Sequence, residues 1–423
     1  MPGPAPAPVL HSTLQERLIL LVLASVQFMS IVDFMVIMPL GPQLERALGL
    51  DTQRFAMVVA AYTYSAGIAG LISTLFLDRF ARRPTFLALF AGFLVGTFAC
   101  GFAGSFWSLL AARALTGAFG GILGGMAMTI IGDVFPEERR GAATGILMMG
   151  FSVATVAGVP VGLTLGQEFG WHAPFLVLAG LCLPLFPIAA LALPRLDGHL
   201  KGPRAATPPR DRLRETFLAA DHIRAFALTV VLMFGGFSVI PFIAPFLVAN
   251  VGVREEQLRY IYVAGGLATL VGMPLIGRVA DRLGKLATFR AIIPLNCILL
   301  FAMTCLPAAP LWVAMLMVAA TMLSNAGRMV PAMAMITSSV EPRLRGGFMG
   351  ANSAVQHIAA GVGTSVGGRL LTRQDGGPIE HFPVVGLIAA IVTLSALWLA
   401  GRLRSGTPAP ARADAPAAAA ELV

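Results

Sequence analysis

Charged residues are scarce in this sequence. Asp, Glu, Lys and Arg make up 12% of its 423 residues, whereas hydrophobic residues make up 57% and the mean hydropathy is +0.80. Soluble domains carry about a quarter of charged residues. The scarcity therefore excludes an ordinary soluble protein and makes lipid the solvent for most of the chain.

Cysteine is scarce as well, and the sequence signatures of enzymes are missing. The four cysteines, Cys100, Cys182, Cys297 and Cys305, fall in or at the ends of apolar runs, and their spacing fits neither a metal site nor a disulfide framework. We find no His/Glu metal pattern, no phosphate-binding glycine loop and no nucleophile elbow. These absences predict a protein that is not an enzyme and holds no metal or cofactor. Its energy source would then be an ion gradient.

Long apolar runs are what the chain has in quantity. A helix needs about 20 predominantly apolar residues to span a membrane, and a helix satisfies its own backbone hydrogen bonds in lipid. Cutting the sequence at its charged and Pro/Gly-containing turns yields twelve runs of this kind. They lie at residues 17–41, 54–77, 84–104, 107–132, 141–166, 172–193, 224–250, 258–277, 287–306, 310–335, 347–369 and 382–402.

Lysine and arginine are distributed unevenly between the turns. The net charge is +9 and the pI is about 10.2, which in a soluble protein would suggest nucleic-acid binding. Here the basic residues collect in alternate turns, such as those of Arg82, Arg139, Arg282 and Arg343, as they do in the cytoplasmic loops of membrane proteins. The pattern excludes nucleic acid as a partner and predicts that both termini face the cytoplasm.

The chain divides into two apolar halves of similar length. The divisions expected are a disordered N-terminus at 1–16, a six-helix bundle at 17–193, a cytoplasmic linker at 194–222, a second six-helix bundle at 223–404 and a disordered C-terminal tail at 405–423. The linker is the only long polar stretch between the spans. Both ends of the chain are rich in Pro and Ala, a composition that does not support a packed core.

A charged turn occurs twice, at equivalent places in the two halves. Residues 277–285, Gly-Arg-Val-Ala-Asp-Arg-Leu-Gly-Lys, follow the second span of the C-terminal half, and residues 74–83, Thr-Leu-Phe-Leu-Asp-Arg-Phe-Ala-Arg-Arg, follow the second span of the N-terminal half. Arg140 and Arg345, which follow the fourth span of each half, are separated by almost the same number of residues. Two motifs with one separation indicate parallel repeats related by an axis along the membrane normal.

With these motifs the chain resembles the major facilitator superfamily, and within it the twelve-span drug/proton antiporters. That family carries Gly-x-x-x-Asp-Arg-x-Gly-Arg/Lys-Arg/Lys between spans 2 and 3. The copy at 277–285 fits this pattern, whereas Thr74 and Ala81 replace the two glycines in the first copy, and a turn with positive φ at Ala81 would be strained.

The resemblance implies an all-α membrane protein in which twelve transmembrane helices form two six-helix parallel pseudo-repeats around a central cavity. It also implies that the two charged turns control conformational change. The residues concerned are Asp78, Arg79, Arg82 and Arg83 in the first turn, and Gly277, Asp281, Arg282, Gly284 and Lys285 in the second.

Asp33 is the only carboxylate deep within a predicted span, and an ionised carboxylate there is costly unless it is paired. Arg113 is its expected partner, because Asp33 lies roughly 12 Å and Arg113 roughly 9 Å from the outer ends of spans 1 and 4, at 1.5 Å per residue. We interpret the pair as a proton-coupling site, since burial disfavours the ionised carboxyl and the guanidinium favours it. A static ion pair that tightens the bundle is the alternative.

Span 5 combines glycines with a proline. Gly158, Pro160 and Gly162, in the order Gly-Val-Pro-Val-Gly, resemble the antiporter signature of proton-coupled exporters. A bare helix face lets another helix approach closely, and Pro160 removes a backbone hydrogen bond and bends the helix. The functional interpretation is a dry helix pair that blocks leakage, and the alternative is tight packing alone.

Candidate residues for a substrate cavity come from both halves. They are Tyr62, Phe237, Phe242, Arg328, Asn352 and Gln356. Aromatic and Met surfaces accept varied apolar ligands, and Arg328 is a second intramembrane cation with no carboxylate at its depth in the C-terminal half. Asn352 and Gln356 are four residues apart and share a helix face. Packing in the core or against lipid is the alternative for most of the aromatic residues.

The function predicted from these residues and the resemblance is proton-driven export of a small, lipophilic compound by alternating access. Proton-coupled efflux of a sugar or another polar metabolite is an alternative, and a lipid-scrambling, channel-like or sensor protein is an alternative of another class. The expected partners are membrane lipid, the small-molecule substrate and protons. We expect a monomeric, multi-pass protein of the inner (plasma) membrane.

Overall fold

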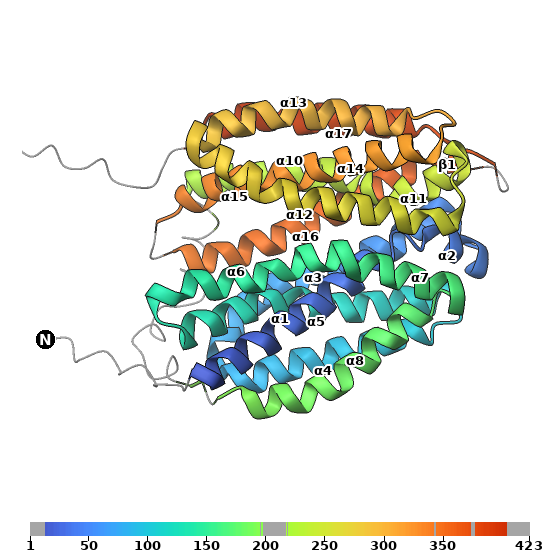
Figure 1. Ribbon diagram of the computed structural model, residues 1–423. Coiled ribbons are helices and arrows are strands. Elements are labelled where there is room, and N and C mark those ends of the chain that lie inside the picture. Colours follow the sequence, from blue (N-terminus) through green and yellow to red (C-terminus); the bar gives the residue numbers. More distant parts are fainter. Residues whose placement is uncertain are drawn as a thin grey trace, which may run out of the picture.

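The computed structural model is almost entirely helical (Figure 1). It describes residues 13–194, 196, 197, 217, 219–341, 344–373 and 377–403. The tail expected at 405–423, residues 1–12 and most of the linker expected at 194–222 lie outside the described residues, so those expectations stay predictions.

The N-terminal bundle is built from six long helical segments, and each spans the long axis of the molecule (Figure 1). They are α1 (Thr13–Val36), α3 (Thr52–Phe76), α4 (Arg82–Gly101), α5 (Phe106–Val134), the composite of α6 (Glu137–Val153), the π-helical turn η2 (Ala154–Gly158) and α7 (Val159–Phe169), and α8 (Ala173–Ala192).

The C-terminal bundle repeats this arrangement with more interrupted helices. Its segments are α10 (Ala220–Phe237) with η5 (Ile240–Phe242), α11 (Ile243–Phe246) and η6 (Leu247–Val251); α12 (Leu258–Leu283); α13 (Lys285–Thr304); α14 (Leu311–Gly327) with α15 (Met329–Ser338); α16 (Arg345–Leu370); and α17 (Phe382–Leu394) with α18 (Ala396–Ala400). Short elements join them: α2 (Gly41–Leu48), η1 (Leu77–Arg79), η7 (Glu255–Gln257) and the antiparallel hairpin of β1 (Thr372–Arg373) and β2 (Ile379–Glu380).

The expected number of spans agrees with the helices observed. In the described part of the chain, eleven helical segments are long and apolar enough to cross a membrane. The remaining long helix, α16, has 26 residues and carries Asn352, Gln356 and His357. It runs beside α3 through the middle of the molecule (Figure 1), so it acts as the twelfth span in spite of its polar side chains.

The first helix differs from the sequence-based boundaries. It begins at Thr13, inside the stretch expected to be disordered, and ends at Val36 instead of residue 41. Pro39 has no N–H to continue the helix and disfavours helical backbone at the residue before it. The chain turns there and starts α2 with Pro42 in the first turn, a position that proline favours.

Side-chain caps set several other helix starts. Asp51 accepts a hydrogen bond from the Arg54 N–H at 2.6 Å and caps α3, and Ser105 and Ser108 form a capping box at the start of α5. Each cap satisfies backbone donors that the first helical turn leaves free. These caps lie at the ends of the bundle, where the chain leaves one span and enters the next.

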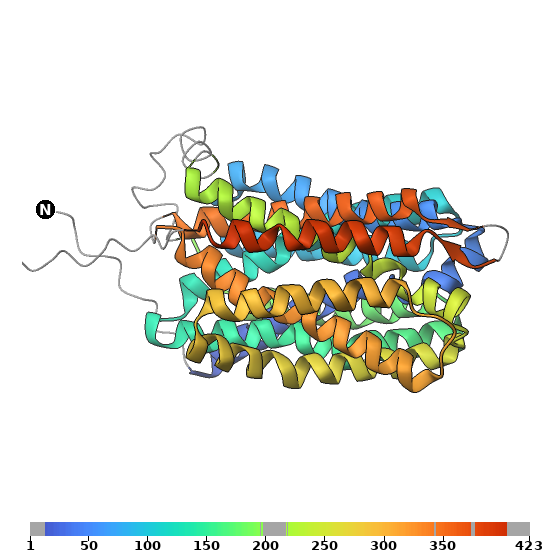
Figure 2. The ribbon, with the colours of Figure 1, turned by 90° about the horizontal axis from the view of Figure 1, so that it is seen from above.

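The two bundles lie side by side and meet along two seams (Figures 1 and 2). Helix α3 packs against α16, where the Tyr64 hydroxyl donates to Ser365 Oγ at 3.1 Å, and η2 with α7 packs against α12. One end of the molecule carries α2, η7 and the β1–β2 hairpin, at the right of Figure 1, and we call it the hairpin end. At the other end, the linker end, the Arg82 N–H donates to the Leu196 carbonyl after α8.

Candidate functional site

Asp33 and Arg113 form a fully buried ion pair in the N-terminal bundle. Asp33 is near the end of α1 and Arg113 is in the second turn of α5, and neither side chain is exposed. Arg113 Nη1 lies 2.8 Å from Asp33 Oδ2 and also donates to the Asp33 carbonyl at 3.2 Å. The structure thus brings together Asp33 and Arg113, which we had paired from their similar predicted depths in the membrane.

The carboxylate has a second donor from another helix. Thr97 of α4 donates to Asp33 Oδ1 at 3.3 Å, so three helices meet at this acid. Within the described residues, Arg113 Nε and Nη2 have no hydrogen-bond partner. A buried charge needs both a counter-charge and hydrogen bonds, and here the carboxylate is better satisfied than the guanidinium.

Aromatic rings connect this ion pair to the opposite bundle. The Arg113 guanidinium lies 4.6 Å from the centre of the Tyr62 ring, within the range of a cation–π interaction. Tyr62 contacts Phe34 at a centroid distance of 5.1 Å, and Phe34 contacts Phe237 of α10 at 5.9 Å. A continuous row of side chains therefore runs from the ion pair across the interface between the bundles, and two of its members, Tyr62 and Phe237, are sequence-predicted cavity residues.

Arg328 is the counterpart of Arg113 in the C-terminal bundle, at the break between α14 and α15. It is also buried, with 1% of its surface exposed. Its Nη1 donates to Asn296 Oδ1 at 2.7 Å and to Thr393 Oγ1 at 3.4 Å, and its Nη2 donates to the Leu232 carbonyl at 2.8 Å. These acceptors are neutral and come from α13, α17 and α10, so Arg328 joins helices within its own bundle.

The remaining cavity candidates do not gather around Arg328. Asn352 is buried and accepts from Thr229 of α10 at 2.8 Å, and Gln356 Nε2 lies 3.8 Å from Met333 Sδ. Phe242 is fully buried and packs edge-on against Phe55 of α3 at 6.5 Å, towards the hairpin end. Of the six candidates, Tyr62 and Phe237 are the two that the row of rings joins to Asp33 and Arg113.

The Gly/Pro segment of span 5 presses directly on α1. A π-helical turn, η2, precedes Pro160, and π-turns are frequent at functional sites. A Cβ added at Gly158 would meet Val32, and one added at Gly162 would meet Val36. These two glycines therefore allow η2 and α7 to approach α1 on either side of Asp33.

The first charged turn is rebuilt where its glycines are replaced. The turn contains η1, and Ala81 has φ −61° and ψ 139° as the N-cap of α4, so the chain avoids the positive φ that would be strained at this residue. Arg79 is exposed, Arg82 Nε lies 3.3 Å from Asp133 Oδ2, and Arg83 Nη2 donates to the Ala190 carbonyl at 2.5 Å. The side chain of Asp78 lies outside the described residues, so its role stays a prediction.

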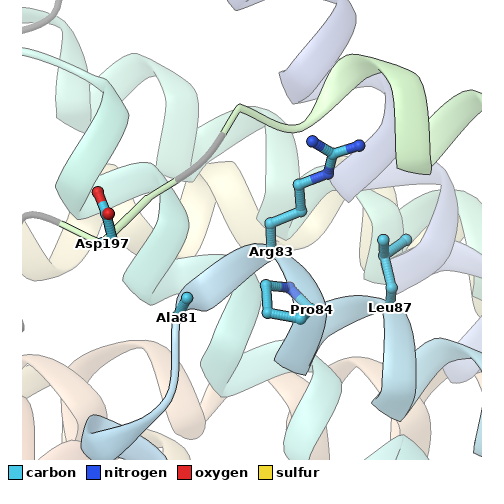
Figure 3. A pocket seen from close by; sticks show the side chains of 5 residues that line it. All are labelled: Ala81, Arg83, Pro84, Leu87 and Asp197. Carbon is cyan, nitrogen blue, oxygen red and sulfur yellow. The ribbon is translucent and has the colours of Figure 1, made fainter.

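A small pocket lies beside this turn. It has a volume of about 270 Å³ and is lined by Ala81, Arg83, Pro84, Leu87 and Asp197. Figure 3 shows that Arg83 points away from Asp197, towards α8. The turn therefore ties α4 to α8 at the linker end of the N-terminal bundle.

The second charged turn keeps its glycine geometry. Gly284 has φ 92° and ψ 146° between α12 and α13, a backbone conformation that residues other than glycine rarely adopt. Asp281, Arg282 and Lys285 are exposed and Gly277 is half-buried. The two copies of the motif thus make the same helix-to-helix connection with different backbones.

Sequence reasoning missed several residues around the buried charges. Phe34 and Thr97 belong to apolar runs without periodicity that would single them out, and neither was selected. Asn296 is a polar residue inside a predicted span, a signal that should have marked it. Within the described ranges no three His, Cys, Asp or Glu side chains gather as a metal site would need.

Comparison with known proteins gives one family. The family model described as Major Facilitator Superfamily matches residues 23–237 and 225–422. The inner membrane transport protein YdhP of Escherichia coli K12 is 24% identical over 374 residues, which cover 87% of this chain and 92% of that protein. A probable sugar efflux transporter of Helicobacter pylori is 23% identical over 236 residues, covering 56% of this chain and 59% of that protein.

A solved structure has the same fold. It is a bacterial homologue of the human lysosomal transporter Spinster, in an inward-facing and occupied conformation. It superposes with a TM-score of 0.69 at 18% identity, covering 94% of this chain and all of that one.

Proposed function

This chain belongs to the Major Facilitator Superfamily, a family of transporters and not of enzymes, and from that premise we propose that it exports a small, largely apolar compound in exchange for protons. The observation that carries the proposal is the fully buried Asp33–Arg113 pair, from which a row of aromatic rings reaches the other bundle. Ionisable groups inside a membrane are costly and mark functional sites by default.

Asp33 is the proton carrier in this proposal. When Asp33 takes up a proton, Arg113 loses its counter-charge but keeps two partners that do not titrate, the Asp33 carbonyl and the face of the Tyr62 ring. Uncompensated loss of a partner from a buried pair costs about 3–5 kcal/mol. The retained contacts reduce this cost, so both protonation states of Asp33 are accessible to the protein.

Coupling to substrate runs through the rings in this proposal. Tyr62 contacts Arg113, and Phe34, next to Asp33 in the chain, contacts Phe237 of the C-terminal bundle. Any movement of one bundle against the other must shift the Phe34–Phe237 contact, and hence the packing around the ion pair. An apolar compound between these rings would compete for the same contacts.

We assign the described conformation to the inward-facing state, with the hairpin end towards the outside and the linker end in the cytoplasm. Ion pairs join the two bundles at the hairpin end, and the Spinster homologue of similar fold is inward-facing. The basic turns at the linker end fit the cytoplasmic side. Alternating access then requires the hairpin end to open.

A sugar is the second candidate for the exported compound, because the relative from Helicobacter pylori carries the name of a probable sugar efflux transporter. The rings of Phe34, Tyr62 and Phe237 favour an apolar compound, although aromatic faces also stack on sugars. A panel that contains both classes separates the two.

The test uses inside-out membrane vesicles whose lumen has been acidified by respiration. Addition of an exported compound should release protons from the lumen in vesicles with the wild-type protein. Asp33→Asn should abolish this release, while Asp221→Asn, which removes a carboxylate from a surface pair with Arg224, should retain it. Normal proton release by a properly inserted Asp33→Asn protein would falsify the assignment of the proton to Asp33.

A further inference from the structure

Two consecutive residues of opposite charge join α2 to the C-terminal bundle at the hairpin end. Glu45 Oε2 accepts from Arg373 Nη1 of β1 at 2.6 Å. Arg46 makes a two-pronged contact with the Glu255 carboxylate, in which Nη2 lies 2.6 Å from Oε2, and Gln167 donates to the Glu255 carbonyl at 2.6 Å. The closed hairpin end is thus held by two ion pairs of reversed polarity.

The two pairs differ in their access to water. The Arg46 side chain is 63% exposed, whereas Glu45 is 7% exposed. Glu45 Oε1 is buried and, in the described part of the structure, has no hydrogen-bond donor. An ionised carboxylate with a buried, unpaired oxygen is costly, so Glu45 is only half-satisfied as an anion even though it contacts Arg373.

The charged groups around Glu45 do not remove this cost. Arg373 and Arg46 favour the ionised form, and Asp51, the cap of α3, opposes it. The other charged groups nearby have partners of their own. Arg54 of α3 lies over the Phe106 ring, and Glu255 is paired with Arg46. Glu380 and His381 contact Thr372 of the hairpin, and α11 carries no titratable residue. Burial, the largest cause, raises the pKa of Glu45 to about 7 in spite of Arg373.

We propose that Glu45 is a second proton-binding site of this transporter, which takes up a proton as the hairpin end closes over it. The closed end buries Glu45 between α2 and the β1–β2 hairpin. Separation of the two bundles would return it to water. The proposal rests on the alternating access proposed above, but it is independent of the proton carried by Asp33.

The sign of the effect follows from the two environments. A carboxyl in water has a pKa of about 4.3, while the pKa of Glu45 is about 7 when the end is closed. Because the closed state binds the proton more tightly, acid favours closure between these two values and rising pH favours opening, by up to about tenfold per pH unit. Above pH 7 the dependence levels off, since Glu45 is then ionised in both states.

Such a site would make the conformational equilibrium of the exporter sensitive to external pH. An acidic outside would load Glu45 and favour closure of the hairpin end after the substrate has left. Because Glu45 returns this proton to the outside when the end reopens, it shifts the equilibrium between the two states and adds nothing to the proton exchange proposed for Asp33.

The experiment measures access through the hairpin end with a reporter thiol. Ser365 touches Tyr64, midway along α3, across the bundle interface. Ser365→Cys introduces the reporter there, and Cys305→Ser removes the exposed native thiol. Right-side-out vesicles are treated with a membrane-impermeant maleimide between pH 5 and 7.5. The rate at which the maleimide labels the thiol in protein with Glu45 is divided by the labelling rate in Glu45→Gln at the same pH. This ratio cancels the pH dependence of the thiol itself.

We expect this ratio to rise by at least tenfold from pH 5 to pH 7 and then to level off, because the neutral glutamine side chain of the Glu45→Gln variant keeps the end closed at every pH. Glu255→Gln breaks the neighbouring ion pair by the same chemical change and should leave the rise intact. Asp33→Asn should also leave it intact, even if that variant no longer couples transport to protons.

A ratio that stays constant with pH overturns the proposal, as does a rise that is lost in Asp33→Asn or in Glu255→Gln. The first of these losses would assign the proton linkage to Asp33 and so support the function proposed above. If the reporter thiol never reacts, the Glu45 proposal is overturned. If Asp33 is nevertheless required for proton release, the proposal that Asp33 couples transport to protons still stands.

Discussion

The two bundles each bury one arginine, and they balance its charge in different ways. Arg113 meets the carboxylate of Asp33 at 2.8 Å, whereas Arg328 meets the amide of Asn296 at 2.7 Å and the carbonyl of Leu232 at 2.8 Å. Both guanidiniums join helices of their own bundle. Of these partners only Asp33 has an ionisable side chain, so a duplicated scaffold carries an acid–base pair in one half and a guanidinium with neutral partners in the other.

The difference also appears in what lies beyond the arginine. Arg113 faces Tyr62, which leads through Phe34 to the other bundle. Arg328 is surrounded by Asn296 and Thr393 inside its own bundle. The N-terminal centre is therefore connected to the interface between the bundles, while the C-terminal centre joins helices within its own bundle.

The largest effect should come from the same substitution made at both arginines. Arg113→Gln leaves Asp33 buried without its counter-charge, which costs about 3–5 kcal/mol or forces the acid to stay protonated, and we expect proton-coupled export to fall roughly 100-fold. Arg328→Gln leaves only neutral acceptors unpaired, at about 1–3 kcal/mol, and should lower thermal stability while coupling persists. Proton release in vesicles and melting in detergent measure the two effects. Equal loss of coupling in both variants would show that the bundles are not functionally distinct.

A smaller effect is expected where span 5 holds the N-terminal centre in place. In Gly158→Leu the new side chain would clash with Val32, beside Asp33, and overpacking of this kind costs about 1–3 kcal/mol, so export should fall roughly tenfold. Gly145→Leu is the matched control, because Gly145 lies in the same span, is exposed and has no atom within 4 Å of an added Cβ. Export that tolerates Leu at both positions would mean that the α1–α7 contact does not support Asp33.

The two charged turns extend the comparison to the backbone. Gly284 has φ 92° and ψ 146°, so Gly284→Ala should destabilise the protein by about 1–3 kcal/mol. Ala81 has φ −61° as the N-cap of α4, a position where glycine is favoured over alanine, so Ala81→Gly should change stability by about 0.5 kcal/mol or less. Thermal melting of both variants in one detergent tests this ranking, and a larger loss for Ala81→Gly would contradict it.

These turns also show what the sequence could and could not predict. The repeat of Asp78 and Asp281 correctly indicated two related halves, and the spans followed from apolar length because lipid leaves helices few alternatives. Identical spacing did not reveal that Ala81 avoids a positive φ by means of η1. A motif constrains which side chains are present, whereas the backbone also depends on packing that acts over the whole helix.

The candidate site shows the same limit. Asp33 and Arg113 could be paired from sequence because both are rare charges at one predicted depth. The partners of Arg328 could not, because an amide and a backbone carbonyl leave no charge signal. Glu45 of α2 and Arg373 of β1 are 328 residues apart, and their closeness depends on how the bundles meet. Contacts that exist in only one arrangement of two bundles are not encoded by any local pattern.

The smallest effect should come from making the C-terminal centre resemble the N-terminal one. Asn296→Asp places a carboxylate against Arg328, so a hydrogen bond in which only the guanidinium is charged gains a counter-charge. Against this gain stand the burial of a new charge and loss of the Asn296 donor to Ser324, so we expect a net stabilisation of about 1 kcal/mol at neutral pH. Melting at decreasing pH should remove the gain as the new carboxyl is protonated, whereas wild type has no such change at this position.

Proton release per exported molecule should stay as in wild type, because the new pair has no row of rings leading to the opposite bundle. An increase in that ratio would mean that any buried carboxylate–arginine pair in this fold can carry a proton, and the contrast between the two bundles would then rest on Asn296 alone.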